Sequence, residues 1–387
     1  MNRISPLDGL RGLAALTVLF HHAALVFPSL AAPHFAGAEV PDVGSPQWWL
    51  VVTPLHVFWE GKSGVYIFFV LSGFVLTLPA VAGRGYVWRS YYPSRLLRLY
   101  LPIWGAVAFA ALTFFIVPRV GQVDSQWLDR RPTRISPEML AKDLTLVAEN
   151  GGIASPLWSL QWEILFSLAL PPIIWAALRL RRLHAIIVVA SIALSTFGGV
   201  VDEPWYIYPP MFVVGVVLAM RREEIVRARR RLRPWGWAAV IGFAAVASTS
   251  RWILFAVGAP QAIIDGSVGL ILVGSCLFVI SAFASPAMAS LLDVKPLRVL
   301  GLLSFSLYLV HEPIMVAAGY ALPDDPLLAV IVAVTVTAVV TPLFYLLIER
   351  PAHRLSKAVA TRLRPSGRPR PRPRPAPEES SVSNGTR

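Results

Sequence analysis

Apolar segments long enough to cross a membrane recur along the chain and constrain its fold more than any other feature. A helix needs about 20 mostly apolar residues to cross ~30 Å of hydrocarbon. Its backbone polar groups must be satisfied internally, so such segments predict helices rather than open sheets. The mean hydropathy of +0.61 agrees with this class. We expect an all-α polytopic membrane protein with about ten transmembrane helices, near residues 8–30, 62–80, 99–118, 156–178, 185–200, 207–220, 235–257, 262–285, 302–321 and 326–348.

Lysine and arginine are divided unevenly between the gaps that separate these segments. Alternate gaps, counted with both chain ends, hold 28 of the 35 Lys and Arg residues, and the opposite gaps hold six. Positively charged loops stay in the cytoplasm during insertion. We therefore expect both termini in the cytoplasm and a multi-pass protein of the cell (inner) membrane. The same pattern accounts for the net charge of +13 without a nucleic-acid partner.

The two ends of the chain differ from its apolar middle. Asp8 and Arg11 interrupt the first apolar run, so we expect it to be kept as a spanning helix rather than removed as a signal peptide. The Arg-Pro alternation near the C-terminus favours an extended chain that lacks a core. We divide the chain into a transmembrane domain, 1–355, and a disordered basic cytoplasmic tail, 356–387. The single cysteine, Cys276, excludes an intrachain disulfide, and no metal site is predicted.

Arg11 and His22 lie in the first segment and carry the clearest functional signal. Eleven residues at ~100° each make three turns plus about 20°, so both side chains share one helix face, roughly 16 Å apart in rise. A cation at one membrane border is thus aligned with an imidazole near mid-bilayer. Ionisable groups at that depth often mark a functional site. His21 points about 80° away from this line, so we select His22.

Polar residues in three other segments fall at a depth similar to that of His22, at 1.5 Å of rise per residue. A lone polar group in hydrocarbon is costly, so we expect these residues to face one another or a water-filled cavity. Each also has a structural alternative: a satisfied interior histidine, a Glu–Arg pair between helices, a serine that permits close helix packing, or a histidine that satisfies backbone near a proline. The four residues are His22, Ser72, Glu163 and His311.

Two arginines precede the third segment one helical turn apart. Arg95 and Arg98 either anchor the cytoplasmic border or, as a pair, hold the phosphates of a ligand, because guanidinium groups bind phosphate oxygens bidentately. The longest gap on the opposite side, 119–155, either caps an acceptor site or simply connects helices.

Several of these segments together resemble the acyltransferase-3 family of bacterial integral membrane O-acyltransferases. The resemblance covers about residues 5–355. Members of that family have about ten spans with cytoplasmic termini. They transfer acyl groups, usually acetyl, from acyl-CoA to hydroxyls of carbohydrate acceptors such as cell-envelope glycans or glycosylated natural products. The matching segments are LDGLRGLAALTVLFHH, FFVLSGFVL, SRLLRLYLPIW, PLWSLQWEILF, LSFSLYLVHEP and IERPAHR.

The resemblance implies roles for individual residues. The family's Arg-x10-His corresponds to Arg11 and His22, and its Arg-x-x-Arg to Arg95 and Arg98. The family's Trp-Ser-Leu-x-x-Glu corresponds to Trp158, Ser159, Leu160 and Glu163. The family often has Tyr after the next Phe, where this chain has Ser167.

These lines of inference combine into one expected site. We expect His22 and Glu163 to be catalytic, with the arginines binding acyl-CoA. We expect the acceptor to be bound by Trp158, Ser159, Ser72 and His311. His22 serves either as general base or as a nucleophile that forms an acyl-imidazole. The alternative function is a transporter or flippase for a lipid-linked glycan, which would also need a mid-membrane polar site.

Overall fold

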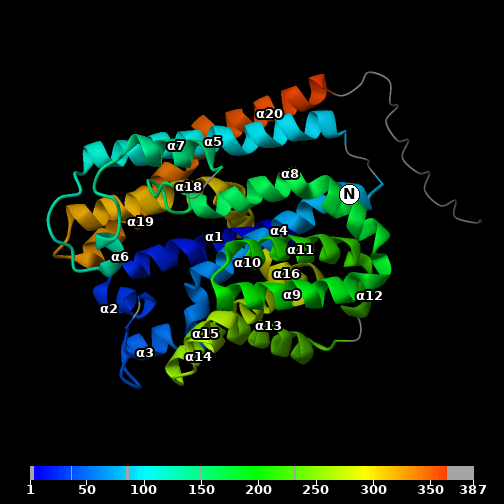
Figure 1. Ribbon diagram of the computed structural model, residues 1–387, viewed down its shortest axis with the longest axis horizontal. Helices are drawn as coiled ribbons and strands as arrows, with labels where there is room; N and C mark the ends of the chain where they lie inside the picture. Colours follow the sequence, from blue (N-terminus) through cyan, green and yellow to red (C-terminus); the bar gives the residue numbers. More distant parts are fainter. Residues whose placement is uncertain (1–3, 36, 84–86, 148–149, 230–231, 364–387) are drawn as a thin grey trace, which may run out of the picture.

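The computed structural model describes residues 4–363 except 36, 84–86, 148–149 and 230–231. It is 81% helical, and no strand occurs in these residues, so the predicted all-α class is confirmed. The axes of most long helices lie roughly along one line, which is horizontal in Figure 1. They are α1 (Ser5–Leu25), α4 (Gly61–Val81), α5 (Trp88–Ile116), α8 (Leu157–Arg179), α9 (His184–Val201), α11 (Pro209–Met220), α13 (Pro234–Ser248), α16 (Val268–Ala284), α18 (Lys295–Ala321), α19 (Pro326–Phe344) and α20 (Arg350–Arg362).

The number of membrane-crossing helices is not confirmed as ten. Among the described residues, seven helices are long and apolar enough to cross a membrane, or nine if each of two bent helix pairs is one span. In these pairs α1 turns by 115° into the short helices after it, and α13 turns by 61° into α14 (Ser250–Ala256). The predicted segment 207–220 is the shorter α11, whose 12 residues rise only about 18 Å. The multi-pass membrane class itself holds.

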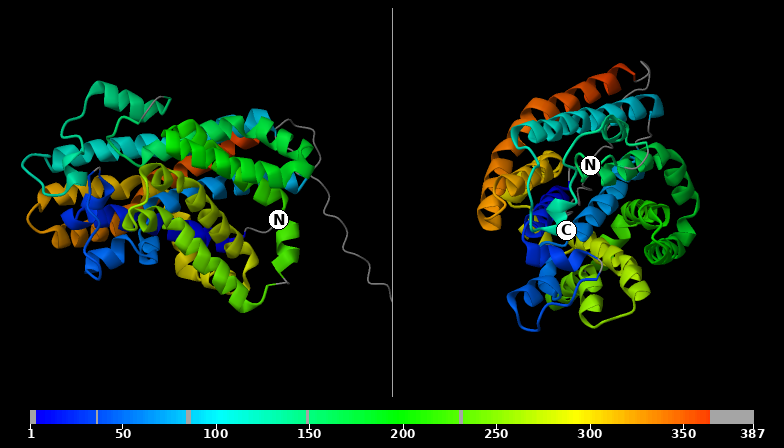
Figure 2. Two further views of the ribbon diagram at one scale, coloured as in Figure 1. Left: turned by 60° about the horizontal axis from the view of Figure 1, so that its bottom comes forward. Right: turned by 60° about the vertical axis from the view of Figure 1, so that its left-hand side comes forward.

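Helix α1 lies at the centre of the molecule and packs against α18, α4 and α16. It contributes Leu10 and Val18 to one core cluster and Leu19 and Ala23 to a second. An apolar helix that is buried on several faces belongs in the interior rather than at the lipid surface. The right-hand view of Figure 2 shows α1 enclosed by the other helices. The residues that α1 carries are therefore held by packing from several sides.

A close approach fixes α1 against α18 near the start of both helices. A Cβ added at Gly301 would lie 1.9 Å from the carbonyl oxygen of Asp8, and one added at Gly12 would lie 2.8 Å from the backbone nitrogen of Gly301. Small residues let helix backbones approach closely in membranes. Ten residues beyond Gly301, His311 meets His22 of α1, so the two helices run parallel from this contact.

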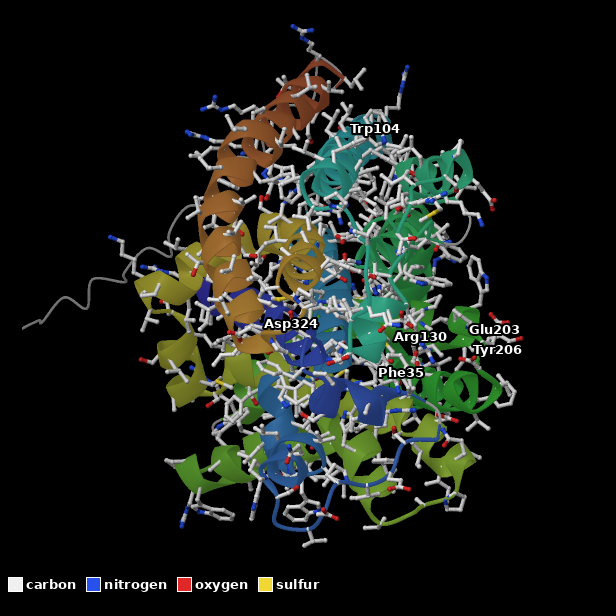
Figure 3. All side chains as sticks on the ribbon, turned by 90° about the vertical axis from the view of Figure 1, so that its left-hand side faces the viewer. Phe35, Trp104, Arg130, Glu203, Tyr206 and Asp324 are labelled. Carbon is white, nitrogen blue, oxygen red and sulfur yellow. The ribbon has the colours of Figure 1, made fainter. Side chains whose placement is uncertain are left out.

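Short helices gather at the end of the molecule to which α1 points. There α2 (Pro28–Ala31), α3 (Pro46–Val51) and α6 (Gln126–Asp129) lie at the left of Figure 1, opposite the N-terminus and α12 (Arg222–Ala228). The predicted orientation makes this the extracytoplasmic end, which we call the outer end. Here α7 (Pro137–Thr145) joins α5, because the exposed Trp104 donates from Nε1 to the Leu144 carbonyl at 3.0 Å (Figure 3).

Two predicted boundaries differ from the structure. Helix α5 begins at Trp88 rather than near residue 99 and includes both Arg95 and Arg98. The apolar criterion missed its first turns because they are rich in arginine and tyrosine. At the other end, α20 continues to Arg362, beyond the predicted domain boundary at 355. The remainder of the predicted tail, from residue 364, lies outside the described residues.

We predict that Gly301→Leu disrupts the packing of α1 against α18. The new side chain would meet backbone atoms that cannot move away independently, and overpacking of this kind costs about 1–3 kcal/mol or more. The apparent melting temperature of the purified protein should fall. Gly242→Leu is the matched control, since a Cβ there meets no atom within 4 Å. Equal melting temperatures for the two variants would contradict the close approach.

Candidate active site

A cavity of about 190 Å³ lies between α1, α4, α5, α8, α18 and the start of α20. Its walls combine apolar side chains with cations and carboxylates. The cavity brings together residues that the sequence analysis selected from four separate segments: Arg11, Ser72, Arg95, Arg98, Ser159 and Glu163. His22, His311 and Trp158 are not among its lining residues. Three arginines and two glutamates, Glu163 and Glu349, thus line one small volume.

Arg95 and Glu163 form an ion pair inside this cavity. Arg95 Nη2 lies 2.6 Å from Glu163 Oε1, which also accepts a hydrogen bond from the Ser72 hydroxyl at 3.3 Å. Arg95 Nε donates to the Ser167 hydroxyl at 3.1 Å. Ser167, where the family often has Tyr, therefore supports Arg95. The Arg95–Glu163 contact is the Glu–Arg pair between helices that the sequence analysis gave as the structural alternative for Glu163.

Arg98 differs from Arg95 because it makes no hydrogen bond or ion pair with any described residue. It lines the cavity one turn after Arg95 on α5. A cation beside an apolar wall needs a counter-charge or water. Of the two α5 arginines, Arg98 is thus the one with donors available for a ligand.

Two cavity residues were missed as site candidates, although they belong to the quoted segment IERPAHR. Glu349 accepts a hydrogen bond from the Ser306 hydroxyl at 2.5 Å, and His353 Nε2 lies 3.6 Å from the other Glu349 oxygen. Both residues line the cavity with the arginines. Their spacing of four residues on one helix face was the available signal. The predicted span ended at residue 348, so both residues lay outside it.

His22 and His311 form a hydrogen-bonded pair further along α1 and α18. His22 Nδ1 lies 2.9 Å from His311 Nε2, and His311 Nδ1 lies 2.9 Å from the Leu307 carbonyl oxygen. A carbonyl only accepts, so His311 carries its proton on Nδ1 and accepts at Nε2. In neutral imidazoles, His22 then donates from Nδ1 and keeps a lone pair on Nε2. This is the tautomer that a general base or a nucleophile requires.

Tyr308 separates the cavity from this histidine pair. Its hydroxyl and that of Ser159 are 2.7 Å apart, its side chain lines the cavity, and its ring centroid is 5.9 Å from that of His311. The four polar residues expected in one layer therefore form two pairs, His22 with His311 and Ser72 with Glu163. Rise along each helix could not show that an aromatic side chain would stand between them.

Trp158 and His21 both lie among other aromatic side chains rather than in the cavity. Trp158 packs against Phe69 and Tyr208, with ring centroids 6.2 Å and 5.0 Å away. His21 turns from His22 toward the outer end, where its Nδ1 lies 3.2 Å from the Trp59 carbonyl oxygen. His21 and His22 thus lie in different surroundings, and the choice of His22 stays a prediction.

The neighbours of His21 form a packed cluster of histidine and tryptophan at the outer end. Buried Glu60 accepts from Trp252 Nε1 at 2.6 Å and from the Lys62 backbone N–H at 3.1 Å, and His56 Nε2 lies 3.3 Å from it. Burial raises the pKa of Glu60 and lowers that of His56. His56 also stacks on Trp59 with a centroid distance of 3.9 Å. Packing this dense makes the cluster a structural element of the outer end.

The described chain is thus a polytopic membrane protein. It has an arginine-lined cavity and, beyond Tyr308, a hydrogen-bonded pair of histidines, His22 and His311. A family model described as an acyltransferase domain matches residues 4–347. The chain therefore belongs to the acyltransferase-3 family and is a membrane acyltransferase. The comparison with curated proteins found no match. The comparison with solved structures found no match either.

We predict that Arg95→Ala destabilises the protein mainly by leaving the Glu163 carboxylate without its partner. Removing one member of a buried pair is costlier than replacing both. The double variant Arg95→Ala with Glu163→Gln should therefore melt at a higher temperature than Arg95→Ala alone. Additive losses in the double variant would show that the pair is not coupled in the folded protein.

Proposed function

We propose that this acyltransferase moves an acyl group, most simply acetyl, from acyl-CoA to a hydroxyl of a carbohydrate acceptor. The observation that carries the proposal is the His22–His311 pair, which leaves His22 Nε2 with a lone pair. The pair lies along the same two helices as the arginine-lined cavity. The family supports acyl transfer, whereas no observation favours the transporter alternative.

The cavity suits the donor by its charge and its size. Arg98 and Arg11 line the cavity and would hold phosphate groups of acyl-CoA, with Arg95 paired to Glu163 beside them. A volume of about 190 Å³ is below the ~300–1,000 Å³ typical of sites that enclose a whole ligand. It therefore suits the narrow thioester arm, with the nucleotide outside. The arm would reach His22 by displacing the Tyr308 hydroxyl from Ser159.

Acyl transfer at His22 can follow two routes, direct transfer or a relay through an acyl-imidazole. In direct transfer, Nε2 takes the proton of the acceptor hydroxyl while the oxygen attacks the thioester carbon. The C–O bond forms, the C–S bond breaks, and the proton passes to the thiolate of CoA. In the relay, Nε2 attacks the thioester carbon first, so a C–N bond forms, the C–S bond breaks and the CoA thiolate leaves. The acceptor oxygen then attacks the acyl carbon, the C–N bond breaks, and the hydroxyl proton passes by way of the freed Nε2 to the thiolate. His311 orients the imidazole in both routes, as a positioning residue.

We predict that His22→Ala abolishes transfer while the protein is still produced and still binds CoA. The test follows radiolabelled acetyl-CoA into the carbohydrate fraction of membranes that contain the protein. His184→Gln is the matched control, because His184 is buried but bonds the Ala177 carbonyl and Arg221 away from the cavity. Substantial transfer by His22→Ala would refute the assigned role. Acid-labile label on the protein without acceptor would support the relay over direct transfer.

We predict that Arg98→Ala weakens donor binding more than it slows turnover. The loss of a charge-assisted contact to phosphate should raise the KM for acetyl-CoA by about tenfold, as expected for ~1.4 kcal/mol. Arg179→Ala removes an exposed arginine of α8 that packs on Trp175 and should leave KM unchanged. An unchanged KM in Arg98→Ala would exclude this phosphate contact.

A further inference from the structure

The side of His22 that faces the outer end is covered by the loop between α5 and α8. Trp127 of α6 lies against His22 with a ring-centroid distance of 5.5 Å, and only 4% of Trp127 is exposed. The sequence left open whether this loop caps a site or only connects helices. Its contact with His22 places Trp127 against the imidazole on that side, and His22 stays half-buried.

A second set of contacts holds Trp127 in place. The Arg131 guanidinium lies 5.0 Å from the centroid of the Trp127 ring, and its Nε donates to the Trp127 carbonyl at 3.2 Å. Arg131 Nη1 also lies 3.4 Å from Oε1 of Glu312, which is 2% exposed. Glu312 follows His311 on α18. Because His311 and Glu312 are consecutive residues, these contacts form a closed circuit. We call this circuit the closed ring, and its members are His22, His311, Glu312, Arg131 and Trp127.

The Arg131–Glu312 contact in this closed ring is longer than several hydrogen bonds that hold the rest of the loop. Elsewhere the loop is fastened by short hydrogen bonds, such as Ser125 Oγ to the Leu25 carbonyl at 2.6 Å and the Gly151 N–H to Asp143 at 2.6 Å. The Arg131–Glu312 contact is longer, at 3.4 Å, and the Arg131 side chain is 20% exposed. The loop is thus held closely at Ser125 and Gly151, whereas both of its contacts with Glu312, from Arg131 and from the Ser155 N–H, are 3.4 Å long.

Figure 3 views the molecule from its outer end. Arg130 and Phe35 are close together there, and the guanidinium of Arg130 lies 4.2 Å from the Phe35 ring centroid. The outer end near α6 thus presents two pairs of an arginine on an aromatic ring, Arg130 on Phe35 and Arg131 on Trp127, and the second pair lies against His22. Aromatic faces stack on the apolar faces of sugars, and guanidinium groups donate to hydroxyl or anionic groups.

We propose that the acceptor reaches His22 from this outer side, and that Trp127 and Arg131, held by Glu312, select it. A carbohydrate ring would take the place of the Arg131 guanidinium on Trp127, and Arg131 would turn to donate to the sugar. The incoming hydroxyl would then lie beside His22 Nε2. With no acceptor, the closed ring keeps water away from the acyl donor. This proposal rests on the proposed function, since it names the route and the recognition residues of the same reaction.

The test measures access to position 22 directly. His22→Cys is made in a Cys276→Ala background, and right-side-out membrane vesicles are treated with a charged, membrane-impermeant maleimide. We expect slow labelling from the outer side. Adding Glu312→Gln should speed it by roughly fivefold, because labelling of a transiently opened site follows the population of the open state.

Glu138→Gln is the matched control for this experiment. It breaks an exposed ion pair with Lys142, 2.8 Å long, in the same loop, and should leave the labelling rate unchanged. Labelling only from the cytoplasmic side, or equal rates with and without Glu312→Gln, overturns the proposal. If Glu312→Gln is poorly folded, Arg131→Gln opens the same pair from its exposed end, and the same outcomes apply.

A second measurement uses acetyl-CoA alone, with His22 intact. Arg131→Ala should raise acceptor-independent hydrolysis of acetyl-CoA by roughly fivefold, as water gains access to the site. A purely structural role of Arg131 would instead lower it, which would overturn the proposal. The labelling result does not depend on catalysis. Failure of the proposed function would appear as undiminished transfer by His22→Ala, so the two failures are distinguishable.

Discussion

The close contact between α1 and α18 is the constraint on which the site depends. Gly12 and Gly301 allow the two backbones to approach where side chains of any size would collide. From that contact the helices run parallel, so Arg11 reaches the cavity near its start and His22 meets His311 about ten residues later. The helix contact therefore fixes the distance between the arginine-lined cavity and the His22 imidazole. A change in this contact would shift both Arg11 in the cavity and the His22–His311 pair.

Polar groups inside this protein are stabilised in different ways, and the difference indicates their roles. Arg95 and Glu163 satisfy each other, and serine hydroxyls complete their hydrogen bonds. Arg98 has no such partner among the described residues, although it lines the same cavity. Arg98 is exposed, so water can satisfy its guanidinium until a ligand takes the place of that water. The same reasoning separates His21, which belongs to a packed aromatic cluster, from His22.

Much of the architecture could be predicted from the sequence, and the reasons for the exceptions are physical. Apolar length gave the helical membrane class, and angular spacing placed Arg11 and His22 on one face. Apolar length failed where polar side chains occupy a helix, as at the start of α5, and where a helix is short, as in α11. Depth along single helices brought His22 near His311 but could not show Tyr308 between them and Ser72. Contacts between distant segments, such as Arg131 with Glu312, carry no periodic signal at all.

The hydrogen bond between Ser159 and Tyr308 has a consequence for the membrane as a whole. Polar groups approach each other from both ends of this molecule, and two hydroxyls 2.7 Å apart lie at the closed end of the cavity. A continuous aqueous passage there would let protons and small ions run down their gradients at every catalytic cycle. Under the proposed function, a Tyr308 side chain that moves aside when the thioester arm enters would limit the leak of ions through the protein during acyl transfer.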